Sequence, residues 1–452
     1  MPTLTAACGL ADPNAVWGMT QAASELVRSL HHLGVQFNVT DDDELDLRNF
    51  GGQKKKRTAF AQSDTGKQLM TALIDAVRRE ESAGTVERFP HHKFRTLLLS
   101  GNICGGCTVQ DTYTGELLRF VCDAVLIATG GLHGLFGDTT GSLANTGEVT
   151  AELFRLGVPM ANLEMIQYHP TTVELGEKRM LLSEAARGEG GRLFALRNGK
   201  PWYFMEEKYP ELGNLMPRDI TAREVWTVSR DYEVFLDMTE LPKEVMEHKL
   251  AGLVDDCQTY LHKDIRKEPI PILPGIHYFM GGIQVDERHR TSMRNLYAAG
   301  ECCAQYHGAN RLGGNSLLGA IYGGQIAAET ACRETVSSPN MPCAEESLLP
   351  ELSPDAQMQM NRILLNALGV VRDAQTLEAG IQEIRKLSGI LPLLGCAMLE
   401  SALARKESRG AHWRADYPQR NDAVYCKTTV AHWNGQHIAI SFESIPERRH
   451  DL

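Results

Sequence analysis

The stretch from Gly281 to Ala328 constrains the fold of this chain more than any other part of the sequence. It contains an apolar run that ends in Ala-Gly-Glu at 299–301, a Gly-rich segment at 307–314 and then a small-residue helical pattern. The apolar run predicts a buried parallel strand that delivers a backbone turn and the Glu301 carboxylate to a ligand. The glycines allow close backbone approach, and Asn315-Ser316 predicts a helix start whose free N–H groups favour negative charge. We therefore expect a cofactor-binding edge here.

A second strand of the same type is predicted earlier in the chain. Alternating strands over 94–99, 108–112 and 117–121 lead to the apolar strand 124–128, which ends in Thr129-Gly130-Gly131. The meander therefore leads into a second buried strand that ends in a Gly-rich turn.

Composition excludes several functional classes. With 452 residues and 43% hydrophobic content, the chain is long enough for two or three domains. A net charge of -11 argues against nucleic-acid binding, and the basic run at 54–57 is interpreted as a solvated loop. No apolar run approaches the roughly 20 residues of a membrane span, and the start lacks a signal pattern, so we expect a cytoplasmic protein.

The eleven cysteines are scattered, and we expect no metal site. Cys104-Gly-Gly-Cys107 has no second pair at matching spacing, so we interpret these residues as incidental thiols. Cys302-Cys303 is interpreted as packing, and no spacing suits an iron–sulfur cluster.

The residues that suggest catalysis lie between 164 and 191. His169 precedes a proline, which disfavours helix and aims the ring out of a turn. Glu184 and Arg187 are three residues apart on a predicted helix. Taken alone, the histidine is a structural residue and the charged pair an ordinary ion pair, so further motifs must decide.

Those motifs resemble one protein family. Ala-Ala-Gly-Glu followed by Gly-Ala-Asn-Arg-Leu-Gly-Gly-Asn-Ser-Leu is similar to the flavoprotein subunit of fumarate reductase and succinate dehydrogenase, a family that includes L-aspartate oxidase. Four more elements of that family recur in order: Pro217-Arg218-Asp219, Ile276-His277-Tyr278 through Gly282, Asn310-Arg311-Leu312, and Lys406 to His412. The resemblance implies an α/β (α+β overall) flavoprotein of the two-dinucleotide type, with FAD as cofactor and an inserted capping domain.

The resemblance also implies roles for residues at fumarate and succinate. Arg218 matches the proton donor, and Glu184 with Arg187 matches the relay that restores its proton. His277 and Arg311 would grip one carboxylate of the substrate, and His169 and Ser183 the other. The loop containing Phe50 and Gly51 would lie over the pocket. The implied FAD contacts are Ala128, Thr129, Gly130, Gly131, Glu148, Glu301, Asn315, Ser316 and Leu317.

The sequence departs from the family pattern at three places. Residues 1–100 contain no Gly-x-Gly-x-x-Gly fingerprint and no counterpart of the covalent flavin histidine, so we expect a chain without its N-terminal flavin segment, through truncation, a late start codon or supply from another polypeptide. Glu148-Val149 replaces Asp-Gly, which puts that flavin contact in doubt. Ser183 replaces threonine, which keeps the hydroxyl and loses a methyl contact.

We expect five segments. The first part of the FAD domain spans 1–168, the capping domain 169–277, the second part of the FAD domain 278–336, a helical domain 345–412 and a C-terminal tail 413–452. Within the tail we expect strands at 428–433 and 437–442. The resemblance implies an iron–sulfur partner subunit, through which the protein would lie on the inner face of a membrane. Two alternatives to fumarate and succinate interconversion stay open: an L-aspartate oxidase, and a non-catalytic or fragmentary flavoprotein that lacks FAD.

Overall fold

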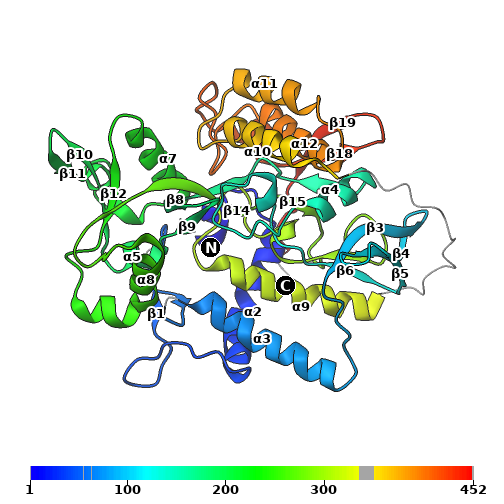
Figure 1. The fold of residues 1–452 in the computed structure, drawn as a ribbon, viewed down its shortest axis with the longest axis horizontal. Coiled ribbons are helices and arrows are strands. Elements are labelled where there is room, and N and C mark those ends of the chain that lie inside the picture. Colours follow the sequence, from blue (N-terminus) through cyan, green and yellow to red (C-terminus); the bar gives the residue numbers. More distant parts are fainter. Residues whose placement is uncertain (1, 54, 63, 335–350, 450–452) are drawn as a thin grey trace.

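The computed structural model describes residues 2–53, 55–62, 64–334 and 351–449 (Figure 1). Helices and strands both occur throughout, as predicted for a mixed α/β chain. The expected segment boundaries at 336 and 345 lie outside the described residues. The expected five-part division therefore stays a prediction.

A pair of parallel strands leads into the turns at 129–131 and 300–302. Strand β6 (Val125–Ile127) pairs with β16 (Leu296–Ala298), with Val125 opposite Leu296 and Ile127 opposite Ala298. Because the strands are parallel, the turn at Thr129–Gly131 and the turn η5 (Gly300–Cys302) lie at the same edge. This arrangement confirms both predicted strands.

An antiparallel meander precedes β6, as the alternating pattern predicted. It consists of β3 (His92–Ser100), β4 (Ile103–Asp111) and β5 (Leu117–Val121). The Cys-Gly-Gly-Cys motif lies within β4, where a Cβ on Gly106 would come 1.9 Å from the carbonyl oxygen of Phe120. The glycine of this motif is therefore required for the approach of β5.

A five-stranded sheet joins segments that are far apart in sequence. Its order is β17-β15-β7-β18-β19. The strands are β7 (Met160–Ala161), β15 (Gly282–Gln284), β17 (Cys303–Ala304), β18 (Lys427–Trp433) and β19 (Ile438–Ser444). The predicted C-terminal strands are thus a hairpin that adds to the edge of a sheet from the middle of the chain.

The segment between the two halves of this sheet has its own hydrophobic core, centred on residues such as Leu193, Val225 and Leu236. Two sheets build it, in the orders β14-β8-β9 and β11-β10-β12-β13. The first contains β8 (Ile166–Leu175), β9 (Lys178–Leu181) and β14 (Leu273–Phe279). The second contains β10 (Arg192–Arg197), β11 (Lys200–Trp202), β12 (Val234–Asp237) and β13 (Ile270–Pro271). Helices α5 (Glu184–Gly188), α6 (Phe204–Lys208), α7 (Arg218–Ser229) and α8 (Ala251–Asp256) complete it.

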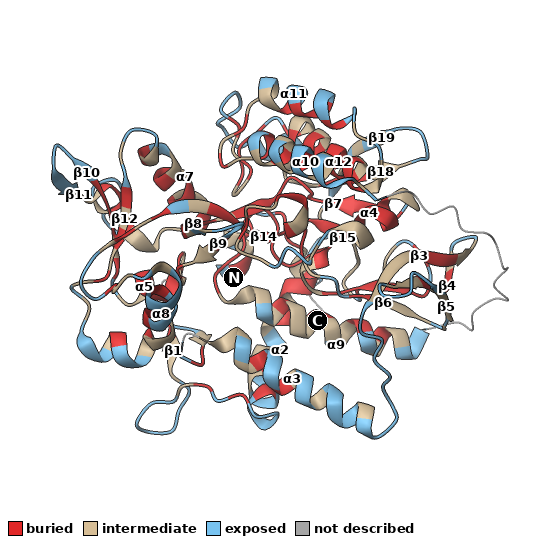
Figure 2. Cartoon of the chain, viewed as in Figure 1, coloured by how far each residue is buried: buried red, intermediate tan, exposed pale blue. Residues whose placement is uncertain are grey.

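Three C-terminal helices pack onto the main core. They are α10 (Pro354–Ala367), α11 (Ala374–Ile384) and α12 (Ile390–Ala404). Ser353 and Asp373 cap the first two by accepting backbone N–H groups, which satisfies donors that a helix start leaves free. Leu364, Leu399 and α4 (Glu148–Arg155) share one buried cluster. Figure 2 shows that buried residues gather along β8, β14 and these helices.

Two long helices at the N-terminal side pack near α9 (Asn315–Glu334). Helix α2 (Pro13–His32) starts at Asp12, whose carboxylate accepts the N–H groups of Asn14 and Ala15. Helix α3 (Thr65–Ser82) contributes Leu69 to a small core with Leu30 and Phe37. Other short elements are α1 (Pro2–Ala6), α13 (Asp422–Tyr425), β1 (Leu47–Arg48) and β2 (Thr58–Ala59). Across the described ranges, no helix combines the length and apolar character needed to cross a membrane.

Candidate active site

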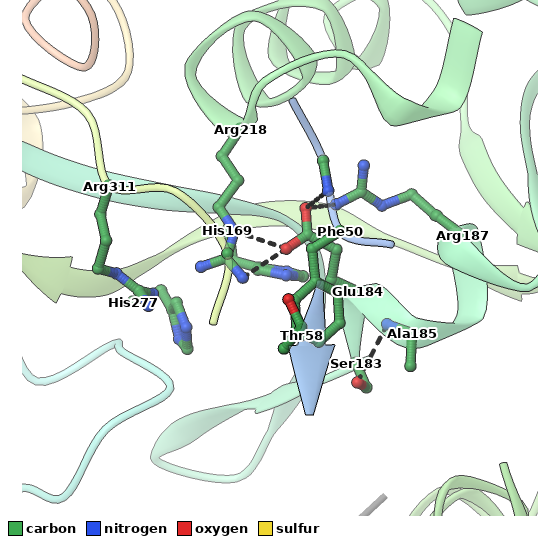
Figure 3. Close-up of polar contacts among 12 residues, drawn as sticks. Phe50, Thr58, His169, Ser183, Glu184, Ala185, Arg187, Arg218, His277 and Arg311 are labelled. Carbon is green, nitrogen blue, oxygen red and sulfur yellow. Dashed lines mark hydrogen bonds and ion pairs between the residues drawn. The ribbon is translucent and has the colours of Figure 1, made fainter. Parts of the chain in front are cut away.

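Five segments bring the predicted catalytic and substrate residues together (Figure 3). His169 lies on β8, Glu184 and Arg187 on α5, Arg218 at the start of α7, and His277 on β14. Arg311 comes from the loop before α9. Each of these residues is buried except His277, which is partly buried. A buried group of charges is costly unless its members pair, so the pairing defines the site.

Glu184 is the centre of the charge arrangement. Its Oε2 accepts hydrogen bonds from Arg218, from Nε at 3.0 Å and Nη2 at 2.6 Å. Its Oε1 accepts Nη2 of Arg187 at 3.0 Å and the backbone N–H of Gly51 at 3.1 Å. Burial alone would raise the pKa of Glu184, but the two guanidinium groups outweigh burial and lower this pKa to about 2. Glu184 is therefore a carboxylate at neutral pH.

Two histidines face each other beside these arginines. The rings of His169 and His277 lie 5.2 Å apart in an edge arrangement. Burial, followed by the charge of Arg218, lowers the pKa of each imidazole well below its ordinary value of 6.5. Nδ1 of His277 lies 2.8 Å from the Thr140 hydroxyl, and Nε2 of His169 has no partner among the described residues. Both rings are neutral at pH 7, and His169 has a nitrogen available for a ligand.

Strand irregularity sets the direction of His277. Ile276 lies opposite Tyr168 and Tyr278 lies opposite Gln167, so His277 is the extra residue of a β-bulge. A bulge re-aims side chains and breaks their strict alternation. Sequence periodicity alone cannot give the direction of His277, because the bulge depends on the partner strand.

Arg311 is a buried cation without a carboxylate partner in the described part of the chain. Burial and the nearby Arg218 lower the pKa of its guanidinium to about 9. Among these six residues, Arg311, Arg218 and Arg187 carry three positive charges and Glu184 carries one negative charge. Glu301 lies outside this group but also acts on the charge of Arg311. With both imidazoles neutral, the cluster has an excess of positive charge that suits an anionic ligand.

Of the predicted loop and hydroxyl residues, Gly51 contacts this cluster directly. A Cβ on Gly51 would come 2.5 Å from Oε1 of Glu184, so this position has room for glycine only. Phe50 packs at the edge of the core of the inserted segment. The Ser183 hydroxyl accepts the N–H of Ala185 at 3.2 Å as the cap of α5, which leaves its own hydrogen for another acceptor.

The predicted cofactor residues form a second group. A Cβ on Gly131 would come 2.6 Å from Oε1 of Glu301, and Gly130 has a φ of +72°. The same Glu301 oxygen accepts the backbone N–H of Phe279 at 3.0 Å. Since Phe279 is two residues from His277 on β14, one strand connects this group to the catalytic cluster.

The other cofactor candidates differ in their surroundings. Asn315 and Ser316 form the first turn of α9, and Leu317 after them is 41% exposed. The amide of Asn315 donates to the Thr3 hydroxyl at 2.9 Å. Ala128 is exposed at the end of β6, next to Thr129. Glu148, in contrast, forms an ion pair with Lys93 at 2.9 Å, so this carboxylate already has a partner.

These residues fit the flavin and ribityl part of FAD. Glycine backbone comes within contact of the Glu301 carboxylate, and the start of a 20-residue helix lies beside the same turn. Such an edge combines close backbone approach with free N–H donors. Within the ranges described, no group of three or more His, Cys, Asp or Glu residues is arranged to hold a metal ion.

Sequence reasoning missed several residues of the site. Gln167 accepts Nη1 of Arg218 at 3.1 Å and donates to the carbonyl oxygen of Arg311 at 2.8 Å. Its position two residues before His169 on an extended segment places both on one face, which was a usable signal. Nε2 of His133 lies 3.6 Å from Oε1 of Glu301, and nothing in the sequence pointed to that contact.

Comparison with known families assigns most of the chain. Residues 1–317 match the family described as FAD binding domain, and residues 389–449 match the family described as fumarate reductase flavoprotein C-term. The succinate dehydrogenase flavoprotein subunit of Bacillus subtilis is 37% identical, over 96% of this chain and 83% of that protein. The fumarate reductase flavoprotein subunit of Mycobacterium tuberculosis is 32% identical, over 94% and 82%.

More distant relatives and solved structures agree in fold. The L-aspartate oxidase of Streptomyces coelicolor is 30% identical over 98% of this chain and 83% of its own length. The quinol fumarate reductase of E. coli superposes with a TM-score of 0.87 at 25% identity, over 98% of this chain and 86% of that chain. The expected flavoprotein fold is therefore confirmed.

Proposed function

Because the chain belongs to the family of fumarate reductase and succinate dehydrogenase flavoprotein subunits, we propose that it interconverts fumarate and succinate. FAD is the cofactor of this oxidoreductase family. One observation carries the proposal. The buried cluster holds three guanidinium groups against one carboxylate, beside two neutral imidazoles. A dianion such as a dicarboxylate balances this excess of charge.

The dicarboxylate would lie between two pairs of residues. Arg311 and His277 would bind one carboxylate, and His169 with the hydroxyl of Ser183 the other. The free Nε2 of His169 and the unused hydrogen of Ser183 support this placement. Binding both ends fixes the double bond in one orientation and polarises it before reaction.

The proposed chemistry is hydride transfer between one carbon of the substrate and N5 of the flavin, which FAD would supply when bound. In the reductive direction, Arg218 would give a proton to the adjacent carbon. Arginine is a weak acid with an ordinary pKa above 12, so this transfer needs a strongly basic carbon centre. Glu184 and Arg187 would then return a proton to Arg218 along the observed hydrogen bonds of 2.6 to 3.0 Å.

Water exclusion supports the same chemistry. Most of the residues in the proposed proton path are buried, and the loop of Phe50 and Gly51 closes against Glu184. A dry site strengthens the charge interactions that bind the substrate. It also keeps the proton on the path between Arg187, Glu184 and Arg218.

The second candidate is an L-aspartate oxidase, favoured by the Streptomyces coelicolor relative. Aspartate carries an ammonium group as well as two carboxylates. Glu184, the carboxylate at the centre of the cluster, is already shared by two arginines and is poorly placed to bind that ammonium. The charge arrangement therefore favours fumarate and succinate.

These relatives are named flavoprotein subunits, and we propose that this chain is likewise a subunit of a larger assembly. We propose that electrons pass between its FAD and an iron–sulfur partner subunit, which would bring the protein to a membrane surface. Co-purification of a tagged chain with an iron–sulfur protein from its source cells would support this assembly.

Two assays test the activity. The purified chain, supplied with FAD, is assayed with fumarate plus reduced viologen and with aspartate plus oxygen, and its flavin absorbance is measured. We expect bound flavin and fumarate reduction. Aspartate turnover without fumarate reduction would overturn the proposal in favour of the oxidase. Lack of bound flavin would favour the non-catalytic alternative.

A further inference from the structure

We propose that Tyr278 is a positioning residue that holds the guanidinium of Arg311 in the orientation needed for a substrate carboxylate. The inference rests on the proposed function, because it concerns how the same site binds a dicarboxylate. It assigns a role to a side chain that touches the binding arginine and is buried away from solvent.

The backbone of Arg311 is fixed, but polar contacts do not fix its side chain. Its carbonyl oxygen accepts Nε2 of Gln167 at 2.8 Å. Its own Nε is buried and has no hydrogen-bond partner in the described parts of the chain. A long side chain in this situation has several rotamers, and selecting one of them costs conformational entropy at the moment of binding.

The Tyr278 ring supplies the missing restraint. The central carbon of the Arg311 guanidinium lies 4.2 Å from the centre of this ring. A guanidinium over an aromatic face is attracted to it, more strongly when both groups are removed from water. Stacking leaves the N–H groups at the edge of the guanidinium available for a carboxylate, whereas an ion pair would occupy them.

The bulge in β14 makes this arrangement possible. Ile276 and Tyr278 pair with the consecutive residues Tyr168 and Gln167, so His277 between them has no partner on β8. At such a bulge the alternation of side chains is broken, and His277 and Tyr278 need not point to opposite sides of the sheet. The proposed substrate histidine and the support for the substrate arginine are therefore neighbours in sequence. The β-bulge would therefore fix the directions of both side chains.

A further aromatic side chain holds the Tyr278 ring itself. The ring of His307 meets it edge-on, with centres 5.3 Å apart at 79°. Burial, followed by the charge of Arg311, lowers the pKa of His307 to about 3, so this ring is neutral. Tyr278 also packs with Leu10, Met165 and Met280. A test must therefore separate positioning of Arg311 from ordinary core packing.

The test compares Tyr278→Phe, which keeps the ring, with Tyr278→Leu, which removes it. Tyr297→Leu is the matched control, because Tyr297 is also buried, on β16 in a different cluster. Binding of fumarate is measured by calorimetry without reductant, and KM and kcat are measured by the viologen assay. Thermal unfolding of each variant is recorded as well.

We expect Tyr278→Leu to weaken fumarate binding by about 10- to 30-fold, which corresponds to loss of one desolvated cation–π contact. The effect should fall on KM more than on kcat. Tyr278→Phe should restore binding to within about 2-fold of the unchanged chain, since the ring face remains. Tyr297→Leu should lower the unfolding temperature without changing fumarate affinity.

A double variant tests whether Tyr278 acts through Arg311. In an Arg311→Gln background the cation over the Tyr278 ring is absent, so adding Tyr278→Leu should have little further effect on binding. Equal losses with and without Arg311 would overturn the proposal. If Tyr278→Leu does not fold, Tyr278→Met replaces it, because methionine fills the space without an aromatic face.

The two proposals fail in different ways. If the unchanged chain binds no fumarate, the proposed function fails and this inference with it. If the unchanged chain binds fumarate and Tyr278→Leu binds it equally well, only the positioning role of Tyr278 is wrong.

Discussion

Two N–H groups of Arg218 donate to the same carboxylate oxygen of Glu184. The distances to Oε2 are 3.0 Å from Nε and 2.6 Å from Nη2. The other oxygen accepts Arg187 at 3.0 Å. Glu184 therefore connects the proposed proton donor to a second arginine without any intervening group. The predictions below begin with this pair.

Arg218→Ala should abolish reaction in both directions while FAD stays bound. Loss of a general acid lowers turnover by about 10²- to 10⁴-fold. Turnover is measured by the viologen assay, and flavin content by absorbance. Arg192→Ala is the matched control, because Arg192 pairs with Glu206 at the surface. Near-normal turnover in Arg218→Ala would remove Arg218 from the proton-donor role.

Glu184→Gln should change how stability depends on pH. The pKa of Glu184 is about 2 in the folded protein, below its ordinary value of 4.5. A lowered pKa gives stability that is present above pH 4.5 and is lost as the pH falls towards 2. This component is about 3 kcal/mol at about 1.36 kcal/mol per pKa unit.

Chemical denaturation at pH 6 and at pH 3 measures this component. The difference in unfolding free energy between the unchanged chain and Glu184→Gln should shrink at the lower pH. An equal difference at both values would show that the charge of Glu184 does not stabilise the fold.

Fumarate affinity should not depend on histidine titration between pH 5.5 and 8. Burial lowers the pKa of His169 and His277 well below 6.5, so neither ring gains a proton in this range. Calorimetry at four pH values checks this expectation. Affinity that rises as the pH falls through 6.5 would mean that one of the rings becomes charged on binding.

Gly131→Ala should reduce FAD content. The added Cβ would meet Oε1 of Glu301 at 2.6 Å and the Phe279 ring at 2.9 Å, so the cofactor edge must shift. Gly324→Ala is the control, because that position on α9 has open space within 4 Å. We expect the ratio of flavin to protein absorbance to fall several-fold in the first variant only. Equal ratios would exclude this edge from FAD binding.

Arg405→Ala should destabilise the attachment of the C-terminal hairpin. Arg405 pairs with Glu164 at 2.7 Å and Glu407 at 2.9 Å, and it donates to the carbonyl oxygen of Lys427 at 2.8 Å. Removing it leaves the buried carboxylate of Glu164 without its ion-pair partner, whereas Glu407 keeps its pair with Arg409. Breaking a buried ion pair costs about 3–5 kcal/mol. Hydrogen exchange should accelerate in β18.

Arg385→Ala is the matched control for this prediction, because Arg385 is largely exposed and pairs with Glu400. An exposed pair contributes about 1 kcal/mol or less. Equal effects of the two variants would show that the buried network around Arg405 adds no particular stability.

Much of the fold was predictable from local patterns. The strands of the meander, β6 and helix α9 follow from periodicity and from turn residues. The C-terminal hairpin was predicted as two strands. Its addition to β7, far away in sequence, was not, because a strand's pattern does not identify its partner.

The sequence predicted the residue types of the candidate site better than it predicted the contacts between those residues. Gln167, Thr140 and His133 were missed, because each acts through a hydrogen bond or ion contact to a residue distant in sequence. The assigned roles of the site residues remain predictions until the variants above are measured.

The sequence by itself determined the family, the cofactor class and the residue types that we propose to bind a dicarboxylate, because these follow from motifs in a fixed order. Only the tertiary structure decided that Glu184 is shared by two arginines, that a bulge sets the direction of His277, and that Arg311 lies over Tyr278. Such contacts depend on distances and side-chain directions where separate segments meet, and packing of the whole chain sets those distances.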